Sequence, residues 1–201
     1  MVPRQPLPQE MDSESEPGGV EPEEKPTSDA IGTLGEHPGD TTCSLQAARS
    51  WRSDANVVGY RSFEAAAEDV IQRRLRGFVV PCAYPDLGHF IMDARLTTAE
   101  AFLHVLPPLV LVSTLEILPK FLAVLYCHPA VVPLLPGLTL EYRELRLVDS
   151  NPHAVTQLLD DPDRERAAAV TNGLSADRHP VQVHEVLRRN LVMPFLYMVK
   201  V

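Results

Sequence analysis

The sequence of 201 residues predicts an α/β fold, in the form of a short solenoid of strand-helix units that follows a disordered N-terminal tail. Two observations lead to this prediction. Stretches typical of strands recur near residues 90, 117, 147, 169 and 197, with stretches typical of helices between them. In addition, the first 40 residues differ sharply in composition from the rest. A single α+β domain, in which helices follow strands without a true repeat, is the alternative fold.

The N-terminal segment has the composition of a disordered chain. Residues 1–40 hold ten acidic and two basic side chains, seven of the nineteen prolines and no aromatic residue. Such a segment cannot bury enough apolar surface to offset the loss of chain entropy on folding. We therefore expect a disordered acidic tail over residues 1–50 and a strand-helix repeat-like domain over residues 51–201.

Local signals place the elements in the first half of that domain. The stretch "SFEAAAEDVIQRRLR" at 62–76 opens on Ser62, ends in basic residues and is followed by Gly77, as a helix would be. The stretches "FVVPCA" at 78–83 and "HFIMDARL" at 89–96 are predicted strands. The stretch "LTTAEAFLHVLP" at 96–107 is a predicted helix, because a threonine cap precedes its acidic residue and prolines end it.

In the second half, "LTLEYRELRLVDS" at 138–150 is a predicted strand, on which Leu145 and Leu147 should point inward. Two stretches, "NPHAVTQLLDD" at 151–161 and "HPVQVHEVLRRN" at 179–190, are predicted helices with a proline in the first turn. The final stretch, "MPFLYMVKV", reads as a strand with no cap after it. An uncovered edge of that kind favours self-association through the C-terminal strand.

The block "AAAVTNGLSADRHPVQVHEVLRRN" combines a strand, an Asn-x-Leu turn at Asn172 and Leu174, and a helix-like stretch. It resembles a unit of the leucine-rich repeat family in its ribonuclease-inhibitor-like form, and the resemblance extends irregularly over about residues 90–201. Asn151 lies one place beyond the family pattern, and Ala167 and Ala169 stand where leucine is usual.

The resemblance implies a non-enzymatic protein-protein interaction module or scaffold, with a protein partner of unknown identity. In such a solenoid the outward strand residues form the concave binding face. The predicted partner-binding residues are Thr114, Glu116, Glu144 and Arg146. Nucleic acid is not an expected partner, because residues 41–201 carry seventeen acidic and sixteen basic side chains without a broad basic surface.

No motif in the chain indicates catalysis, a cofactor or a metal ion. His179 and His184 are five residues apart, which places their rings on different faces of a helix, and Cys82 has only the neighbouring His89 as a conceivable base. We therefore expect no catalytic residue, no cofactor and no metal site. The three cysteines show no paired spacing, which favours a reducing, cytoplasmic location.

A small membrane-associated protein is the alternative function. The apolar stretch over residues 102–135 is long enough for a membrane anchor, and Glu116 and Lys120 are its only formal charges. Five internal prolines and this central pair of charges argue against a membrane span, so a membrane partner is not expected.

Overall fold

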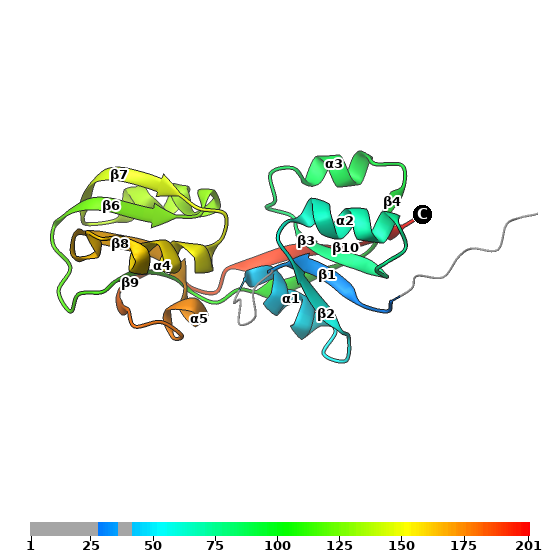
Figure 1. Cartoon of the computed structure of the whole chain (residues 1–201), viewed down its shortest axis with the longest axis horizontal. Coiled ribbons are helices and arrows are strands. Elements are labelled where there is room, and N and C mark those ends of the chain that lie inside the picture. The colour runs from blue at the N-terminus through cyan, green and yellow to red at the C-terminus, as the bar shows by residue number, and fades with distance from the viewer. Residues whose placement is uncertain (1–27, 36–41) are drawn as a thin grey trace, which may run out of the picture.

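The computed structural model describes residues 28–35 and 42–201, and shows two lobes joined by two short crossings (Figure 1). Lobe 1 contains residues 28–105 together with 192–201, and lobe 2 contains residues 106–191. Most of the predicted tail, residues 1–27 and 36–41, lies outside the described residues. The remaining part of 1–50 contributes a strand and most of a helix to lobe 1.

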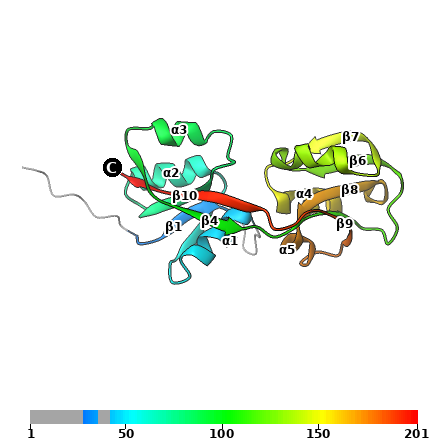
Figure 2. The ribbon, with the colours of Figure 1, turned by 180° about the vertical axis from the view of Figure 1, so that it is seen from behind.

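Lobe 1 is built on a five-stranded sheet in the order β2-β1-β3-β10-β4. Its strands are β1 (Ile31–Leu34), β2 (Val57–Tyr60), β3 (Gly77–Pro81), β4 (Leu96–Val105) and β10 (Val192–Lys200). Strands β1, β2 and β3 are parallel, whereas β10 runs antiparallel to both of its neighbours, β3 and β4. Figure 2 shows β4 and β10 side by side as they approach the second lobe.

Helices cover both faces of this sheet. They are α1 (Cys43–Trp51) on one face, and α2 (Phe63–Ile71) and α3 (Leu87–Met92) on the other (Figure 1). The alternation of β3 explains the two layers, because successive side chains of a strand point to opposite faces. Phe78 and Val80 pack in the cluster beneath α2, and Val79 packs in the cluster beneath α1. All three are fully buried.

Lobe 2 repeats this arrangement with the sheet order β7-β6-β8-β5-β9. Its elements are β5 (Leu109–Ser113), β6 (Phe121–Cys127), the 3-10 helix η1 (Pro129–Gly137), β7 (Glu141–Leu147), α4 (Asn151–Asp160), η2 (Arg164–Arg166), β8 (Ala167–Asn172), α5 (Gly173–Ala176) and β9 (Gln182–Arg188). Strand β6 is parallel to β7 and β8, and β5 runs antiparallel to β8 and β9. In both lobes four of the five strands therefore run in one direction, and one inner strand, β10 or β5, runs in the opposite direction.

The leucine-rich-repeat solenoid is wrong, because the chain forms two separate mixed sheets. The chain near residue 90, expected as a strand, forms α3. The chain near residue 117, also expected as a strand, is the loop between β5 and β6. The strands expected near 147 and 169 are β7 and β8 of lobe 2, whereas the one near 197 is β10 of lobe 1. Among the residues that the structure describes, no single row of parallel strands runs through the chain to form a concave face.

Several individual elements are confirmed, and three are not. Helices α2 and α4 and strands β3, β7 and β10 lie where the sequence predicts them. The stretches predicted as helices at 96–107 and 179–190 contain the strands β4 and β9, and the predicted strand at 89–96 contains most of α3. Pairing with β10 and β5, which lie far away in the sequence, overrides the local helix signals.

The final strand is internal to its sheet. Strand β10 pairs with β3 on one side and with β4 on the other, so self-association through the C-terminal strand loses its basis. On β7, Leu145 is half-buried but Leu147 is 56% exposed, which contradicts the inward orientation predicted for Leu147. In the part of the chain that the structure describes, no helix has the length and apolar character needed to cross a membrane.

Candidate ligand site between the lobes

The N-terminal ends of two helices, one from each lobe, meet where the lobes touch. Cys43 is the first residue of α1, and its thiol is hydrogen-bonded to the side chain of Asn151, the first residue of α4. The residues before them cap the two helices: the Thr42 hydroxyl accepts from the backbone N–H of Leu45 (3.2 Å), and the Ser150 hydroxyl from that of His153 (3.3 Å). Each helix N-terminus therefore presents its positive end to the interface.

Two polar residues at the end of β8 and one in α5 extend this contact within lobe 2. The Thr171 hydroxyl donates to the backbone oxygen of Asn151 (2.7 Å), and the Asn172 side chain accepts from the backbone N–H of Ser175 (2.8 Å), which caps α5. Thr171, Asn172 and Ser175 are all 0% exposed. We call Cys43, Asn151, Thr171, Asn172 and Ser175 the interlobe cluster.

Two atoms of the interlobe cluster lack a hydrogen-bond partner. Within residues 28–35 and 42–201, the only buried side-chain oxygens without one are Oδ1 of Asn151 and Oγ of Ser175. A buried polar atom without a partner costs about 1 to 3 kcal/mol, so proteins seldom retain one without a reason. The amide oxygen of Asn151 can only accept a hydrogen bond, whereas the hydroxyl of Ser175 can both donate and accept one.

The interlobe cluster carries no formal charge. Burial raises the pKa of the Cys43 thiol to about 11, and the hydrogen bond from Asn151 offsets only part of this effect. The thiol therefore stays protonated at neutral pH and is a poor nucleophile. The remaining members are hydroxyl and amide side chains, which bind ligands through hydrogen bonds rather than through charge.

A groove of about 720 Å³ runs between the lobes beside the first crossing. Both lobes line it, through Gln46, Arg49, Ser50, His104, Val105, Leu106, Pro107, Pro108, Val110, Gly173, Leu174, Asp177 and Val183. Lobe 1 contributes a positive charge to the groove, from Arg49, and lobe 2 contributes a negative charge, from Asp177. Burial lowers the pKa of His104, whose ring meets Phe195 edge-on with 6.3 Å between the ring centroids.

The two crossings are tied to each other and to the interlobe cluster. The backbone N–H of Leu106 in the first crossing donates to the carbonyl of Leu191 in the second (2.8 Å). The backbone N–H of Gly173, next to Asn172, donates to the carbonyl of Pro108 (2.8 Å). A Cβ on Gly173 would lie 3.1 Å from Cγ of Pro108, so a larger residue would crowd this contact. The connection between the lobes is therefore narrow and ordered.

The four predicted partner-binding residues lie apart from this site. Glu144 and Arg146 form an exposed ion pair (2.7 Å) on β7, at the edge of the lobe 2 sheet. Thr114 and Glu116 lie in the loop after β5, where the Thr114 hydroxyl contacts the carbonyl of Arg164 (3.5 Å). They do not share a concave face, and whether they bind a partner stays a prediction.

The other residues considered from the sequence show no catalytic or metal-binding arrangement. Burial raises the pKa of the Cys82 thiol, which disfavours the reactive thiolate. His184 lies on β9 and its Nε2 is 2.8 Å from the Ser113 hydroxyl. Ser113 is fully buried, which leaves no room for a substrate at this pair. Among the described residues, no group of three or more His, Cys, Asp or Glu side chains could hold a metal ion.

No family model matches the chain, and a search of curated proteins found no significant match. Solved structures do resemble it. A prephenate dehydratase from Arthrobacter aurescens, in complex with L-Phe, gives a TM-score of 0.61 at 18% identity, over 86% of this chain and 60% of its own. GqqA, described as a quorum-quenching acylase, gives 0.54 at 18% identity, over 86% and 64%.

A prephenate dehydratase from Staphylococcus aureus subsp. aureus Mu50 gives a TM-score of 0.52 at 13% identity, over 85% of this chain and 66% of its own. The chain thus spans 60% to 66% of the length of these three proteins. Identities this low establish similarity of fold alone. The chain has a two-lobed α/β fold shared with these proteins, in place of a leucine-rich repeat.

Proposed function

We propose that this protein binds a small polar molecule between its two lobes, at the interlobe cluster. The observation that carries the proposal is the pair of buried, unpartnered oxygens on Asn151 and Ser175. A ligand that donates a hydrogen bond to Asn151 and accepts one from Ser175 would satisfy both. The positive ends of α1 and α4 favour a ligand with a negative charge.

The position of the cluster in the fold supports the same proposal. Helix α1 follows β1, and α5 follows β8, so these parts of the cluster lie beyond the carboxyl ends of parallel strands. Ligands of open α/β sheets bind at such strand ends. Two lobes joined by two short crossings can also separate to admit a ligand and close over it.

The test is a thermal-shift screen of the full chain against small hydroxy acids, amino acids, dicarboxylates, sugars and inorganic phosphate. A ligand that binds only the folded protein raises its melting temperature. We expect at least one compound to stabilise the wild type and to lose this effect in Ser175→Ala and Asn151→Ala. Ser53→Ala, in an exposed turn of lobe 1, is the control and should respond as the wild type does. A compound that stabilised all four proteins equally would refute binding at the interlobe cluster.

The expectation that the chain is not an enzyme stays a prediction, since structures with a similar fold are described as prephenate dehydratases and an acylase. The expected protein partner was inferred from a leucine-rich-repeat surface. Because the chain has no such solenoid among its described residues, that inference no longer has support. A cytoplasmic location stays a proposal, supported by three free cysteines among the described residues. Fractionation of cells that express the chain would test the location.

A further inference from the structure

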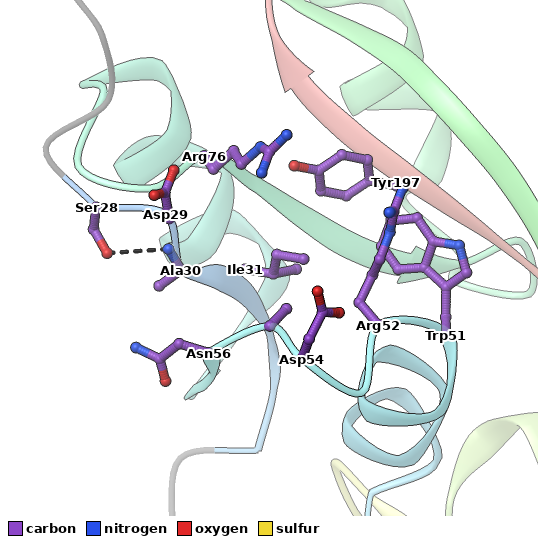
Figure 3. Close-up of a pocket in the computed structure, with 11 residues that line it drawn as sticks. Ser28, Asp29, Ala30, Ile31, Trp51, Arg52, Asp54, Asn56, Arg76 and Tyr197 are labelled. Carbon is purple, nitrogen blue, oxygen red and sulfur yellow. Dashed lines mark hydrogen bonds between the residues drawn. The ribbon is translucent and has the colours of Figure 1, made fainter.

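A second cavity lies in lobe 1, at the end of the sheet opposite to the interlobe cluster. Its volume is about 400 Å³, which lies within the usual range for small-molecule sites (Figure 3). It opens at the amino ends of two parallel strands, because Ile31 begins β1 and Arg76 directly precedes β3. The C-terminal end of α1 and the ring of Tyr197 form its other walls.

Gly77 allows Tyr197 to form this wall. A Cβ on Gly77 would lie 2.4 Å from Cε2 of Tyr197 and 2.7 Å from the backbone oxygen of Met198, distances that real Cβ atoms do not reach. Without a side chain at 77, the ring lies across the start of β3 and its hydroxyl lies beside Arg76 (Figure 3). The Tyr197 ring also contacts Trp51, with 5.0 Å between the ring centroids.

Two guanidinium groups line the pocket, at different parts of its wall. Arg52 donates to Glu100 (3.0 Å) and stacks over Trp51 at 4.6 Å from the ring centroid. Arg76 forms no side-chain hydrogen bond or ion pair within the described part of the chain. Burial raises the pKa of Tyr197; the charges of Arg76 and Arg52 lower it, and those of Asp29 and Glu100 raise it, so charges of both signs act at its hydroxyl.

The pocket also holds two exposed carboxylates, of which Asp29 lies near Arg76 and Asp54 near Arg52 (Figure 3). Asp54 follows the end of α1 and points into the pocket, and Asp29 precedes β1 (Figure 3). No ion pair of the described residues involves either one. Opposite charges therefore line one cavity without neutralising each other in direct pairs.

We propose that this pocket binds a free α-amino acid, with its carboxylate against Arg76 and the Tyr197 hydroxyl and its ammonium group against Asp54. An inorganic anion would be repelled by Asp29 and Asp54, and a simple cation by Arg76, which has no ion-pair partner among the described residues. A zwitterion can meet Arg76 and Asp54 at once. The buried side chain of Ile31, together with Ala30 and Ala55, supplies apolar surface for the ligand's side chain.

Isothermal titration calorimetry of the full chain tests the proposal, with L-leucine and L-phenylalanine as probes at up to about 10 mM, enough to detect a millimolar Kd. Two analogues of leucine each remove one charge: 4-methylpentanoate lacks the ammonium group, and 3-methylbutylamine lacks the carboxylate. The variants are Arg76→Gln and Asp54→Asn, both at exposed positions that should not impair folding. Arg61→Gln, an exposed arginine of lobe 1 outside the pocket, is the control.

We expect at least one amino acid to bind, and each analogue and each pocket variant to raise Kd by about tenfold or more. Arg61→Gln should bind as the wild type does. Binding of neither amino acid, or equal binding by the wild type and both pocket variants, would overturn the proposal. Binding lost in Ser175→Ala but kept in Arg76→Gln would also overturn it, and would assign the amino acid to the interlobe cluster instead.

Discussion

Ser175 carries a buried hydroxyl without a hydrogen-bond partner, which the proposed function assigns to ligand binding. Its backbone N–H caps α5 through Asn172, but its own oxygen has no partner. Thr171, two residues before the helix, is equally buried but donates its hydroxyl to the carbonyl of Asn151. The two residues therefore differ in whether the protein itself satisfies the hydroxyl.

Replacing these two hydroxyls should have opposite consequences for stability. Ser175→Ala removes an unsatisfied atom, so the free energy of unfolding should stay constant or rise by up to about 1 kcal/mol. Thr171→Val leaves the Asn151 carbonyl without its donor and should cost about 1 to 3 kcal/mol. Urea denaturation of both variants measures the difference. A clear loss of stability in Ser175→Ala would mean that its oxygen has a partner in solution.

Cys43 should titrate only at high pH. Its pKa is raised to about 11 from 9.0, so the folded state holds the proton more tightly than the unfolded state does. Its contribution to stability is complete below pH 9 and is lost as pH rises from about 9 to 11. The difference in free energy of unfolding between the wild type and Cys43→Ala, measured from pH 7 to 11, should shrink over that window. A difference that is constant with pH would contradict the raised pKa.

At the scale of single elements, the sequence predicts the position of a helix well when its capping residues and its pattern of buried residues agree. Ser62 before α2 and the proline in the first turn of α4 are such signals, and both helices are found where these residues place them. Strand β4 was missed because Thr97, Thr98 and Glu100 imitate a helix start. Its partner β10 follows about ninety residues later, and the residues around β4 contain no pattern that predicts a pairing over that distance.

Close packing against the neighbouring helices explains why β8 consists mainly of alanine. The leucine-rich-repeat interpretation could not explain these small residues. Ala167 and Ala169 face α4 in the same cluster as Ala154, Val155 and Leu158, and all five are 0% or 1% exposed. Ala168 and Val170 face the opposite cluster around η1. Alanine on both faces lets helices approach the sheet closely, which explains why leucine is absent here.

Enlarging Ala169 should therefore overpack the sheet against α4. Ala169→Leu should cost about 1 to 3 kcal/mol or more in the free energy of unfolding, because the neighbouring atoms have no space to move into. Ala101→Leu is the matched control, since Ala101 is exposed on the edge strand β4 and should tolerate the change. Equal losses in the two variants, measured by urea denaturation, would show that α4 does not press on β8.

At the scale of the whole molecule, the division into two lobes could not be predicted from the sequence. The interlobe cluster joins Cys43 to residues more than a hundred positions later, and the final strand returns to the lobe that the chain left at Val105. The sequence does contain one local signal of the site. Thr42, Ser150 and Asn172 each follow a strand and cap the next helix, a pattern that places helix N-termini near strand ends.

Lobe 2 should fold by itself, because residues 106–191 are contiguous and contain a complete sheet with helices on both faces. A fragment of residues 106–191 should show a cooperative thermal transition by circular dichroism. A chain that lacks residues 192–201 should retain this transition but lose the folded signal of lobe 1, since β10 lies between β3 and β4. Melting of lobe 1 in that truncated chain with wild-type cooperativity would refute the role given to β10.

The central place of β10 has a consequence for how the chain is made. Domains generally fold in the order in which the ribosome releases them, the N-terminal one first. Here lobe 1 lacks an inner strand until residues 192–200 have been synthesised, whereas every residue of lobe 2 has already been added by then. The strands β3 and β4 therefore lack their shared partner until residues 192–200 have been synthesised. A chain that stopped at residue 191 would contain every strand of lobe 2 but would lack β10 of lobe 1.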